Sequence, residues 1–597
     1  MKPNRTARAA ARHAVICLAA FCAAIAGGAP SGAAADRGER AAYWVFLEAR
    51  PDSPSKTLLL TELGERLSVR ALERRARRGE IEGIRDSDLP VAAAARSRVL
   101  ATGARPRVES RWLNAVSVDA TLEQIAQIAG MPDVITVRRV SSRTARLPAP
   151  GAAPHAIDRA GGARGPIPAP APPRPLDLAQ LDYGASRPQL EQIGVTKLHE
   201  SGLSGAGVMI GVLDTGFDIA HPALLSAEIV GQRDFVNGDD NTADEEAESS
   251  WWHGTYVLSL IAGFDPGNLI GAAHGASFVV AKTEDVANET QVEEDYWVAG
   301  LEWAESLGVD VVTSSLGYND WYAYEQMDGE TAVTTRAARM AVERGVVVVN
   351  AMGNEQGTAW RHMLAPADAE EVISVGAVNS NGALASFSSL GPTADGRTKP
   401  DVVALGVGNF GARAGGGYLA NTGTSFATPL VAGVAALILE AHPTYTPAQV
   451  QLALRETAAQ CRTPDTNLGW GLVRANVAAT HPNPGGGCSS VPIDTTDVEP
   501  PSQVSPITRP GGDVFAPAHG PLDWSYTLAS AGTLQCRLFD ASGRMLAVIL
   551  DGEFAAGEIA IAWDGRFDAG GSAPSGVYFL RAESAARVDT ERLVLVR

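Results

Sequence analysis

The sequence contains few cysteines and fewer basic than acidic residues. Its 597 residues include five cysteines, and 49 lysines and arginines stand against 68 aspartates and glutamates, which gives a net charge of −19. Nucleic-acid binding requires a basic surface, so we expect no nucleic-acid partner. A chain of this length can bury a large core without disulfide support. Cys461 and Cys488 could form a disulfide that leaves Cys536 over, but the sequence does not decide this pairing.

The N-terminal region lacks an apolar run that is long enough for a membrane anchor. Its apolar segment, residues 14–26, is shorter than the roughly 20 residues that a transmembrane helix needs. A basic segment with Lys2 and Arg5 precedes this run, and the small residues 32–35 follow it. This order is typical of a secretory signal. We therefore assign residues 1–35 to a signal peptide and expect a secreted, extracellular protein.

Two segments that are rich in proline, alanine and glycine divide the remainder of the chain. Residues 146–180 and 481–505 cannot form a core and are predicted to be linkers. The unit before them, residues 41–145, alternates predicted strands and helices and has the size of a small α+β domain. It includes an arginine-rich helix at residues 68–78, which we expect to be solvated.

Residues 181–480 are predicted to form an α/β domain. Runs that are rich in valine and isoleucine are separated by helical stretches, which indicates a parallel sheet with helices on both faces. In such a sheet the active site lies at the carboxyl ends of the strands. Asp214 and the segment 350–354 both follow predicted strands, so they are candidates for that site.

Ser425 lies where a turn of small residues enters an apolar helix. A hydroxyl at the positive end of a helix can act as a nucleophile beside amides that hold an oxyanion, although most serines there only cap the helix. His253, in a His-Gly-Thr motif, is the candidate base, and Asp214 at a strand end is the candidate orienting acid. An aspartate, a histidine and a serine in this order indicate a serine hydrolase.

Two other functions compete with this prediction. An α/β-hydrolase esterase requires Gly-x-Ser-x-Gly and the order serine, acid, histidine. Here Ala427 replaces the second glycine and Ser425 comes last, which disfavours an esterase. Outside the enzymes, the alternative is a catalytically silent adhesion or scaffold protein that keeps the same fold, and the complete set of three groups argues against it.

The chain resembles the subtilisin-like serine endopeptidases, or subtilases, over residues 185–480. The matching motifs occur in the order of that family and are Val212-Leu-Asp214-Thr-Gly216, His253-Gly254-Thr255, Asn350-Ala-Met-Gly353-Asn354 and Gly423-Thr-Ser425-Phe-Ala-Thr-Pro429. The resemblance implies a subtilisin-like sheet, polypeptide substrates and an acyl-enzyme mechanism with Asp214, His253 and Ser425 as catalytic residues. It also implies that Asn354 donates its side-chain amide to the oxyanion, together with the backbone N–H of Ser425.

The same resemblance predicts where the substrate binds. Ser315, Leu316 and Gly317 match the segment that pairs with the substrate backbone and forms one wall of the first specificity pocket. Tyr318 follows where many members have another glycine, so this wall departs from the family pattern. No cofactor is expected for the reaction.

A structural calcium ion is a separate question, and we assign no metal ligand. Many family members carry an aspartate shortly after a His-Pro pair, but here Ala223 follows His221 and Pro222. The acidic stretch 239–248 could bind calcium through its oxygens, and a solvated acidic loop is the other interpretation.

The two outer units also carry resemblances. Residues 41–145 resemble the propeptides of this family, which implies that the unit assists folding, inhibits the enzyme intramolecularly and is cleaved off within 141–181. Residues 506–597 have the strand and turn spacing of a β-sandwich. They resemble Ig-like modules of the flagellar-hook-capping and type IX sorting kind. Either a passive stability module or a module that attaches the protein to the cell surface through secretion machinery is consistent with this resemblance.

Overall fold

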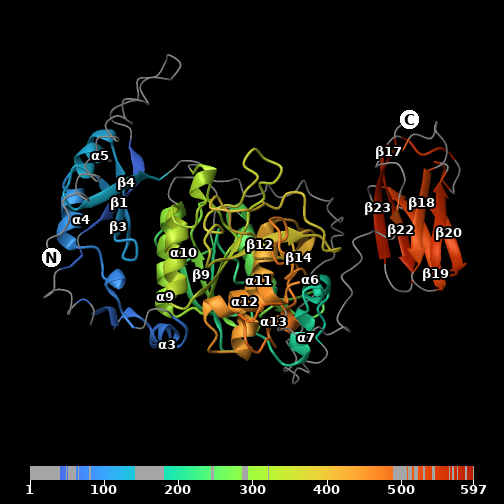
Figure 1. The fold of residues 1–597 in the computed structure, drawn as a ribbon, viewed down its shortest axis with the longest axis horizontal. Coiled ribbons are helices and arrows are strands. Elements are labelled where there is room, and N and C mark those ends of the chain that lie inside the picture. The colour runs from blue at the N-terminus through green and yellow to red at the C-terminus, as the bar shows by residue number, and fades with distance from the viewer. Residues whose placement is uncertain are drawn as a thin grey trace, which may run out of the picture.

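In the computed structural model the chain forms three folded units (Figure 1). It describes residues 40–140, 181–488 and 507–595, apart from gaps at 49, 52–58, 60–61, 65, 80–82, 244–247, 286–292, 320–321, 509–513, 516–521, 529–530, 541–544, 564, 568–570, 575 and 585–587. The predicted signal peptide, the linker 146–180 and residues 489–505 of the second linker lie outside these residues. We call the three units the N-terminal, central and C-terminal units.

The N-terminal unit is a four-stranded antiparallel sheet in the order β2-β3-β1-β4. Its elements are β1 (Ala41–Leu47), α3 (Val69–Arg78), η2 (Asp86–Asp88), α4 (Ala93–Leu100), β2 (Arg105–Ser110), β3 (Ala115–Ala120), α5 (Leu122–Ala129) and β4 (Val134–Arg139). Val45 and Val118 face a core that includes Val99 of α4 and Ile128 of α5. Because side chains alternate along a strand, Trp44 and Phe46 point to the opposite face, where they join a core of the central unit.

The central unit is built on a seven-stranded parallel sheet in the order β13-β12-β11-β10-β5-β9-β6. Its strands are β5 (Met209–Asp214), β6 (Glu228–Asp234), β9 (Ser277–Lys282), β10 (Val311–Ser314), β11 (Val347–Ala351), β12 (Ile373–Val378) and β13 (Val402–Leu405). The predicted α/β fold with a subtilisin-like sheet is confirmed. The sequence did not reveal β6, which has charged residues and lies at the sheet edge, or the four-residue strand β13.

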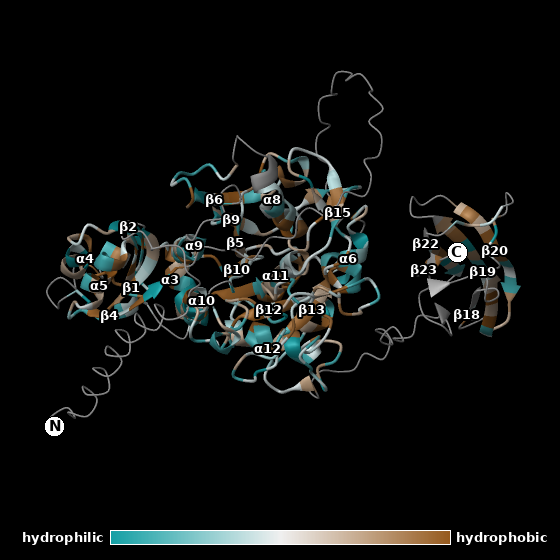
Figure 2. Cartoon of the chain, turned by 90° about the horizontal axis from the view of Figure 1, so that it is seen from above, coloured by the Kyte–Doolittle hydropathy of each residue, from teal (hydrophilic) through white to brown (hydrophobic). Residues whose placement is uncertain are grey.

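Helices cover both faces of this sheet. The unit contains α6 (Arg187–Gln192), α7 (Val195–Glu200), α8 (Glu248–Ala262), α9 (Glu293–Leu307), α10 (Val333–Glu343), α11 (Thr424–Ala441), α12 (Pro447–Thr457) and α13 (Ala475–Ala478), with short elements η4 (Pro222–Leu224), β7 (Phe264–Asp265), β8 (Leu269–Ile270), η5 (Tyr324–Gln326), β14 (Asn409–Ala412) and β15 (Tyr418–Asn421). Along β10, Val311 faces the core with α8 and α11, while Val312 faces α9 and α10. Figure 2 shows hydrophobic residues concentrated around β10, β12 and β13 in the middle of this unit.

Helix α11 is apolar on all sides, as the sequence predicts. Among the residues that the structure describes, it alone is long and apolar enough to cross a membrane, but 89% of it is buried within the protein. The all-round apolar pattern is therefore the pattern of a central core helix. Near the end of this unit, Cys461 and Cys488 form a disulfide with their Cα atoms 5.9 Å apart.

The C-terminal unit consists of two packed sheets. One has the order β16-β18-β21 and the other β17-β23-β22-β19-β20. The strands are β16 (Ile507–Thr508), β17 (Val514–Phe515), β18 (Leu522–Leu528), β19 (Gly532–Asp540), β20 (Met545–Phe554), β21 (Gly557–Trp563), β22 (Gly576–Ser584) and β23 (Val588–Leu595). Trp524 of one sheet and Leu580 of the other share a single core, which also contains the free Cys536. The predicted β-sandwich is confirmed.

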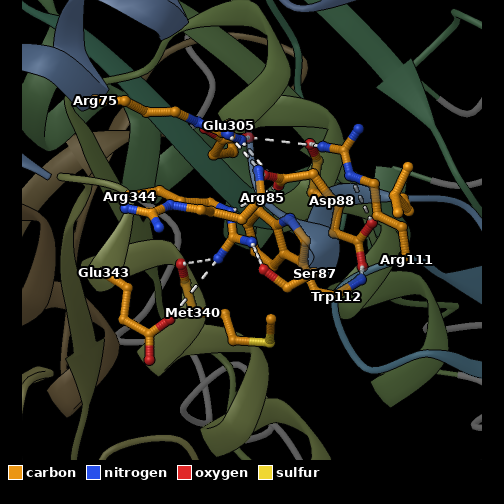
Figure 3. A network of polar contacts seen from close by, with 12 residues as sticks. Arg75, Arg85, Ser87, Asp88, Arg111, Trp112, Glu305, Met340, Glu343 and Arg344 are labelled. Atoms are coloured by element: carbon orange, nitrogen blue, oxygen red, sulfur yellow. Dashed lines mark hydrogen bonds and ion pairs between the residues drawn. The ribbon is translucent and has the colours of Figure 1, made fainter. Parts of the chain in front are cut away.

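One face of the arginine-rich helix α3 is buried, so the expectation that the helix is solvated is wrong. Arg74 and Arg75 are fully buried and both pair with Glu305 near the C-terminal end of α9. Arg75 also pairs with Asp88, whose other oxygen accepts from Arg344 at the end of α10. Figure 3 shows the guanidinium groups of Arg75 and Arg344 gathered with the carboxylates of Asp88 and Glu305. The pattern of charges could not reveal this, because Glu305, the partner that Arg74 and Arg75 share, lies 230 residues beyond Arg75 in the chain.

Candidate active site

The candidate site lies at the carboxyl ends of three adjacent parallel strands. Asp214 is the last residue of β5, Ser314 the last residue of β10, and Asn350 lies near the end of β11. The register pairs Ser314 with Leu213 on one side and with Asn350 on the other, so the three strand ends are level. This is the edge at which an α/β sheet offers its site.

His253 reaches this edge from α8 because two glycines allow a close approach. A Cβ on Gly254 would lie 2.2 Å from the carbonyl oxygen of Gly216, which no side chain tolerates. Gly216 itself has a φ of 133°, a conformation that L side chains rarely adopt. The backbone N–H of Gly254 donates to Thr215 Oγ1 at 3.3 Å. The glycine in each motif therefore brings α8 into contact with the end of β5.

His253 and Asp214 form a buried hydrogen-bonded pair. His253 Nδ1 lies 2.7 Å from Asp214 Oδ1, and neither side chain is exposed to solvent. A carboxylate only accepts hydrogen bonds, so Nδ1 carries the proton and Nε2 keeps its lone pair. Within the part of the chain that the structure describes, Nε2 has no hydrogen-bond partner. The arrangement leaves one basic nitrogen available at the strand edge.

Ser425 is the second residue of α11 and is 2% exposed. Its Oγ donates to the carbonyl oxygen of Ser315 at 3.2 Å, and Ser315 Oγ donates to the carbonyl oxygen of Ser425 at 2.8 Å. These reciprocal bonds fix the start of α11 against the segment that follows β10. The next side chain, Phe426, packs 5.6 Å from the His253 ring, which places the serine and the histidine at the same edge. In the described structure the hydroxyl is bonded to Ser315 and not to His253.

Asn354 is oriented by Thr424, a residue that the sequence analysis did not single out. Its Oδ1 accepts from the backbone N–H and from the Oγ1 of Thr424, both at 3.0 Å. The amide oxygen is thus occupied, and the NH₂ group is the end that remains for another partner. Thr424 directly precedes Ser425, and this adjacency is the signal by which the sequence could have revealed it.

Residues 315–317 run in an extended path beyond β10. The side-chain amide of Asn350 donates to the carbonyl oxygen of Leu316 at 3.0 Å and so holds this segment against the end of β11. Tyr318 pairs through its backbone with Ala365, and its ring is buried, with the hydroxyl 3.0 Å from Glu284 Oε1. Burial, reinforced by the Glu284 carboxylate, raises the pKa of Tyr318 well above its usual value. Tyr318 is therefore a neutral structural support at neutral pH.

Residues 221–223, where many family members have the calcium motif, are held by local hydrogen bonds. Ala223 is buried and donates its N–H to His221 Nδ1 at 3.1 Å, while His221 Nε2 lies 2.9 Å from the carbonyl oxygen of Gly417. In the described ranges no group of three or more histidines, cysteines, aspartates or glutamates could hold a metal ion. Residues 244–247 of the acidic stretch lie outside those ranges.

Three family models match the chain. The subtilase family matches residues 205–471, the peptidase S8 propeptide domain of Bacteroidota matches residues 42–151, and the FlgD Ig-like domain matches residues 513–587. These matches confirm the resemblances of all three units, although the C-terminal match supports the FlgD type only.

Several curated proteins are similar to the middle of the chain. Subtilisin NAT of Bacillus subtilis subsp. natto and Subtilisin E of Bacillus subtilis (strain 168) are each 37% identical over 302 residues, which is 50% of this chain and 72% of each relative. Subtilisin of Bacillus pumilus is 36% identical over 302 residues, which is 50% of this chain and 98% of that protein. With the strand edge, the His253–Asp214 pair and these relatives in view, the chain belongs to the subtilase family of serine endopeptidases, and it carries a propeptide domain before the protease and an FlgD Ig-like domain after it.

Proposed function

We propose that this subtilase is an exported endopeptidase that cleaves polypeptides with Ser425 as nucleophile, His253 as general base and Asp214 as the orienting acid. The observation that carries the proposal is the buried His253–Asp214 pair, which leaves Nε2 available beside the start of α11. Buried pairs of this kind hold the imidazole in one tautomer and stabilise the imidazolium that forms during the reaction.

The reaction starts when Ser425 Oγ attacks the carbonyl carbon of the substrate and its proton moves to His253 Nε2. The hydroxyl exchanges its bond to the Ser315 carbonyl for this transfer. The oxyanion is held by the Asn354 amide, which Thr424 aims, and by the backbone N–H of Ser425 in the first turn of α11. Collapse of the tetrahedral intermediate breaks the C–N bond and returns the proton to the leaving amine.

Water then completes the reaction. The acyl group is bound to Ser425 as an ester, and His253 takes a proton from a water molecule that attacks the ester carbonyl. The second tetrahedral intermediate releases the carboxylic acid product and restores the serine hydroxyl. The same donors hold both oxyanions, so the loss of one donor slows both steps.

The test is peptide hydrolysis by the processed protein and by Ser425→Ala. We expect casein cleavage by the wild type and a fall in kcat of about 10⁶-fold in the variant, the size of loss seen when such a nucleophile is removed. Circular dichroism of both proteins provides the control for folding. Activity that persists in Ser425→Ala, after exclusion of contaminating protease, contradicts the assignment of the nucleophile.

We also propose export and surface attachment. The signal-like segment 1–35 supports export, and the FlgD Ig-like match supports a role of the C-terminal unit outside catalysis. A chain without residues 506–597 should remain an active protease but lose its attachment to the cell. An unchanged location of the shortened chain removes this role and leaves a passive module.

A further inference from the structure

The space beside the nucleophile is bounded by two segments that each contain a glycine. One wall is the segment 315–317, whose first carbonyl oxygen lies 3.2 Å from Ser425 Oγ. The other wall contains Gly353, the residue before Asn354. A substrate carbonyl that is attacked by Ser425 and held by the Asn354 amide must lie between these walls. The side chain next to that carbonyl, on the acyl side of the scissile bond, then enters the gap between Gly317 and Gly353.

Leu364 already occupies this gap. A Cβ on Gly317 would lie 2.7 Å from Leu364 Cβ and 2.9 Å from Leu364 Cδ1. A Cβ on Gly353 would lie 2.7 Å from Leu364 Cγ and 2.8 Å from the same Cδ1. Both glycines are therefore needed to admit one leucine side chain, and the Cδ1 methyl group is in contact with both walls.

The backbone holds Leu364 firmly in this place. Its N–H donates to the carbonyl oxygen of Met352 at 3.1 Å, beside one wall. The next residue, Ala365, exchanges two backbone hydrogen bonds of 2.9 and 3.1 Å with Tyr318, beside the other wall. Residues 363–365 thus form a third strand-like segment between the two walls, and Leu364 is 5% exposed.

The residues next to Leu364 are buried and packed. Met363, which precedes it, and Met352, whose carbonyl oxygen accepts its N–H, are fully buried and pack with Met327 in a separate small core. Tyr318 is buried as well, with its hydroxyl bonded to Glu284. Leu364 is thus flanked in the chain and across its backbone hydrogen bonds by packed residues, and a close-packed interior resists rearrangement of a side chain. The gap therefore ends at the leucine methyl groups.

We propose that Leu364 closes the primary specificity pocket, so that the enzyme cleaves after small residues such as alanine, glycine and serine and rejects aromatic and long aliphatic residues. This inference rests on the proposed role of Ser425 and Asn354, because they fix where the substrate carbonyl lies. Leu364 acts by occupying volume and takes no part in the chemistry.

The test compares peptide p-nitroanilides that differ only in the residue before the scissile bond, with alanine, leucine or phenylalanine at that place. For the wild type we expect kcat/KM to be about 10- to 100-fold higher for alanine than for phenylalanine, the range by which an apolar pocket discriminates on size. In Leu364→Gly the pocket opens, and the ratio of phenylalanine to alanine should rise by at least about tenfold. Leu364→Met keeps the volume and should keep the wild-type ratio.

The outcomes separate this inference from the proposed function. A wild type that cleaves after phenylalanine or leucine as well as after alanine overturns the inference but leaves the nucleophile assignment intact. Absence of hydrolysis for all three peptides and for casein, in correctly processed wild type, contradicts the proposed function instead. If Leu364→Gly does not fold, Leu364→Ala opens the gap less and should shift the ratio in the same direction. An unchanged ratio in a folded Leu364→Ala protein contradicts the proposal.

Discussion

The N-terminal and C-terminal units are attached to the protease in different ways. The N-terminal unit shares a core with it, because Trp44, Phe46 and Trp112 pack with side chains of α9 and α10. The C-terminal unit has a core of its own that contains residues 524–595 only, and it stands apart from the protease in both views (Figures 1 and 2). The first unit is thus built as part of the protease fold, and the second as a separate module. A propeptide must match the surface of its own enzyme, whereas a module needs only its own core.

Buried charged groups lie in the interface between the N-terminal unit and the protease. Glu305 pairs with Arg74 and Arg75. Burial alone would raise the pKa of the Glu305 carboxyl, but the two arginines outweigh burial and hold that pKa below its usual range. On the same helix, Glu302 accepts from Ser110 Oγ and from the backbone N–H of Trp112. A foreign domain without these donors would leave the carboxylates of α9 buried and unpaired, which is costly.

The largest effect should come from Glu305→Ala, made in the uncleaved Ser425→Ala chain. The variant leaves two buried guanidinium groups without their shared carboxylate, a change that costs about 3–5 kcal/mol. Amide hydrogens of α3 should therefore exchange on the order of 10²–10³ times faster, as measured by mass spectrometry. Glu200→Ala, which removes an exposed glutamate from α7, is the matched control and should leave α3 protected. Unchanged protection of α3 in Glu305→Ala would break the contrast between the two units.

A smaller, pH-dependent effect should come from Asp295 at the start of α9. Burial raises the pKa of its carboxyl to about 6, against the opposing influence of Arg107 and Ser117. Since the pKa is near 3.8 when the chain is unfolded, this group favours folding most below that value and progressively less as the pH rises to 6. The rise of about two in the pKa of Asp295 corresponds to a change of about 3 kcal/mol at most in the free energy of unfolding.

Asp295→Asn removes this titration and isolates it from the other carboxylates. Two chains are compared: Ser425→Ala, and the double variant that also carries Asp295→Asn. Relative to the double variant, the chain that keeps Asp295 should lose thermal stability as the pH rises from about 4 to 6. Above about pH 6 the difference in stability between the two chains should stay constant. Differential scanning calorimetry of the two chains measures this. A difference that grows in the opposite direction would mean that Arg107 outweighs burial.

The smallest effect should come from removal of residues 506–597. Because their core includes no residue of the protease, the unfolding temperature of the remaining two units should change by less than about 1 °C, and kcat/KM by less than about twofold. A shift of several degrees in that transition would show that the C-terminal unit supports the protease and would weaken the contrast with the N-terminal unit.

The sequence predicted the parts of the fold that depend on local pattern. Continuous valine runs, as in Val347–Ala351, indicated the buried strands of the parallel sheet. Asp214, His253 and Ser425 could be predicted as site residues because each lies in a motif with its own glycine or small residue. The environments of Arg74 and Leu364 could not be predicted from local sequence motifs. Their environments are formed by segments that are distant in sequence, so a buried arginine looked solvated and a pocket leucine looked like any core residue.

The position of α11 in the chain determines the stage of folding at which Ser425 is positioned. Ser425 lies in the first turn of this helix, and the helix packs against β10, β11, β12 and β13, all of which precede it in the chain. Until those strands have paired, the helix lacks the sheet surface against which it packs, and Ser425 is not held beside Ser315. A partly folded chain therefore lacks the arrangement of Ser425 that the proposed reaction requires.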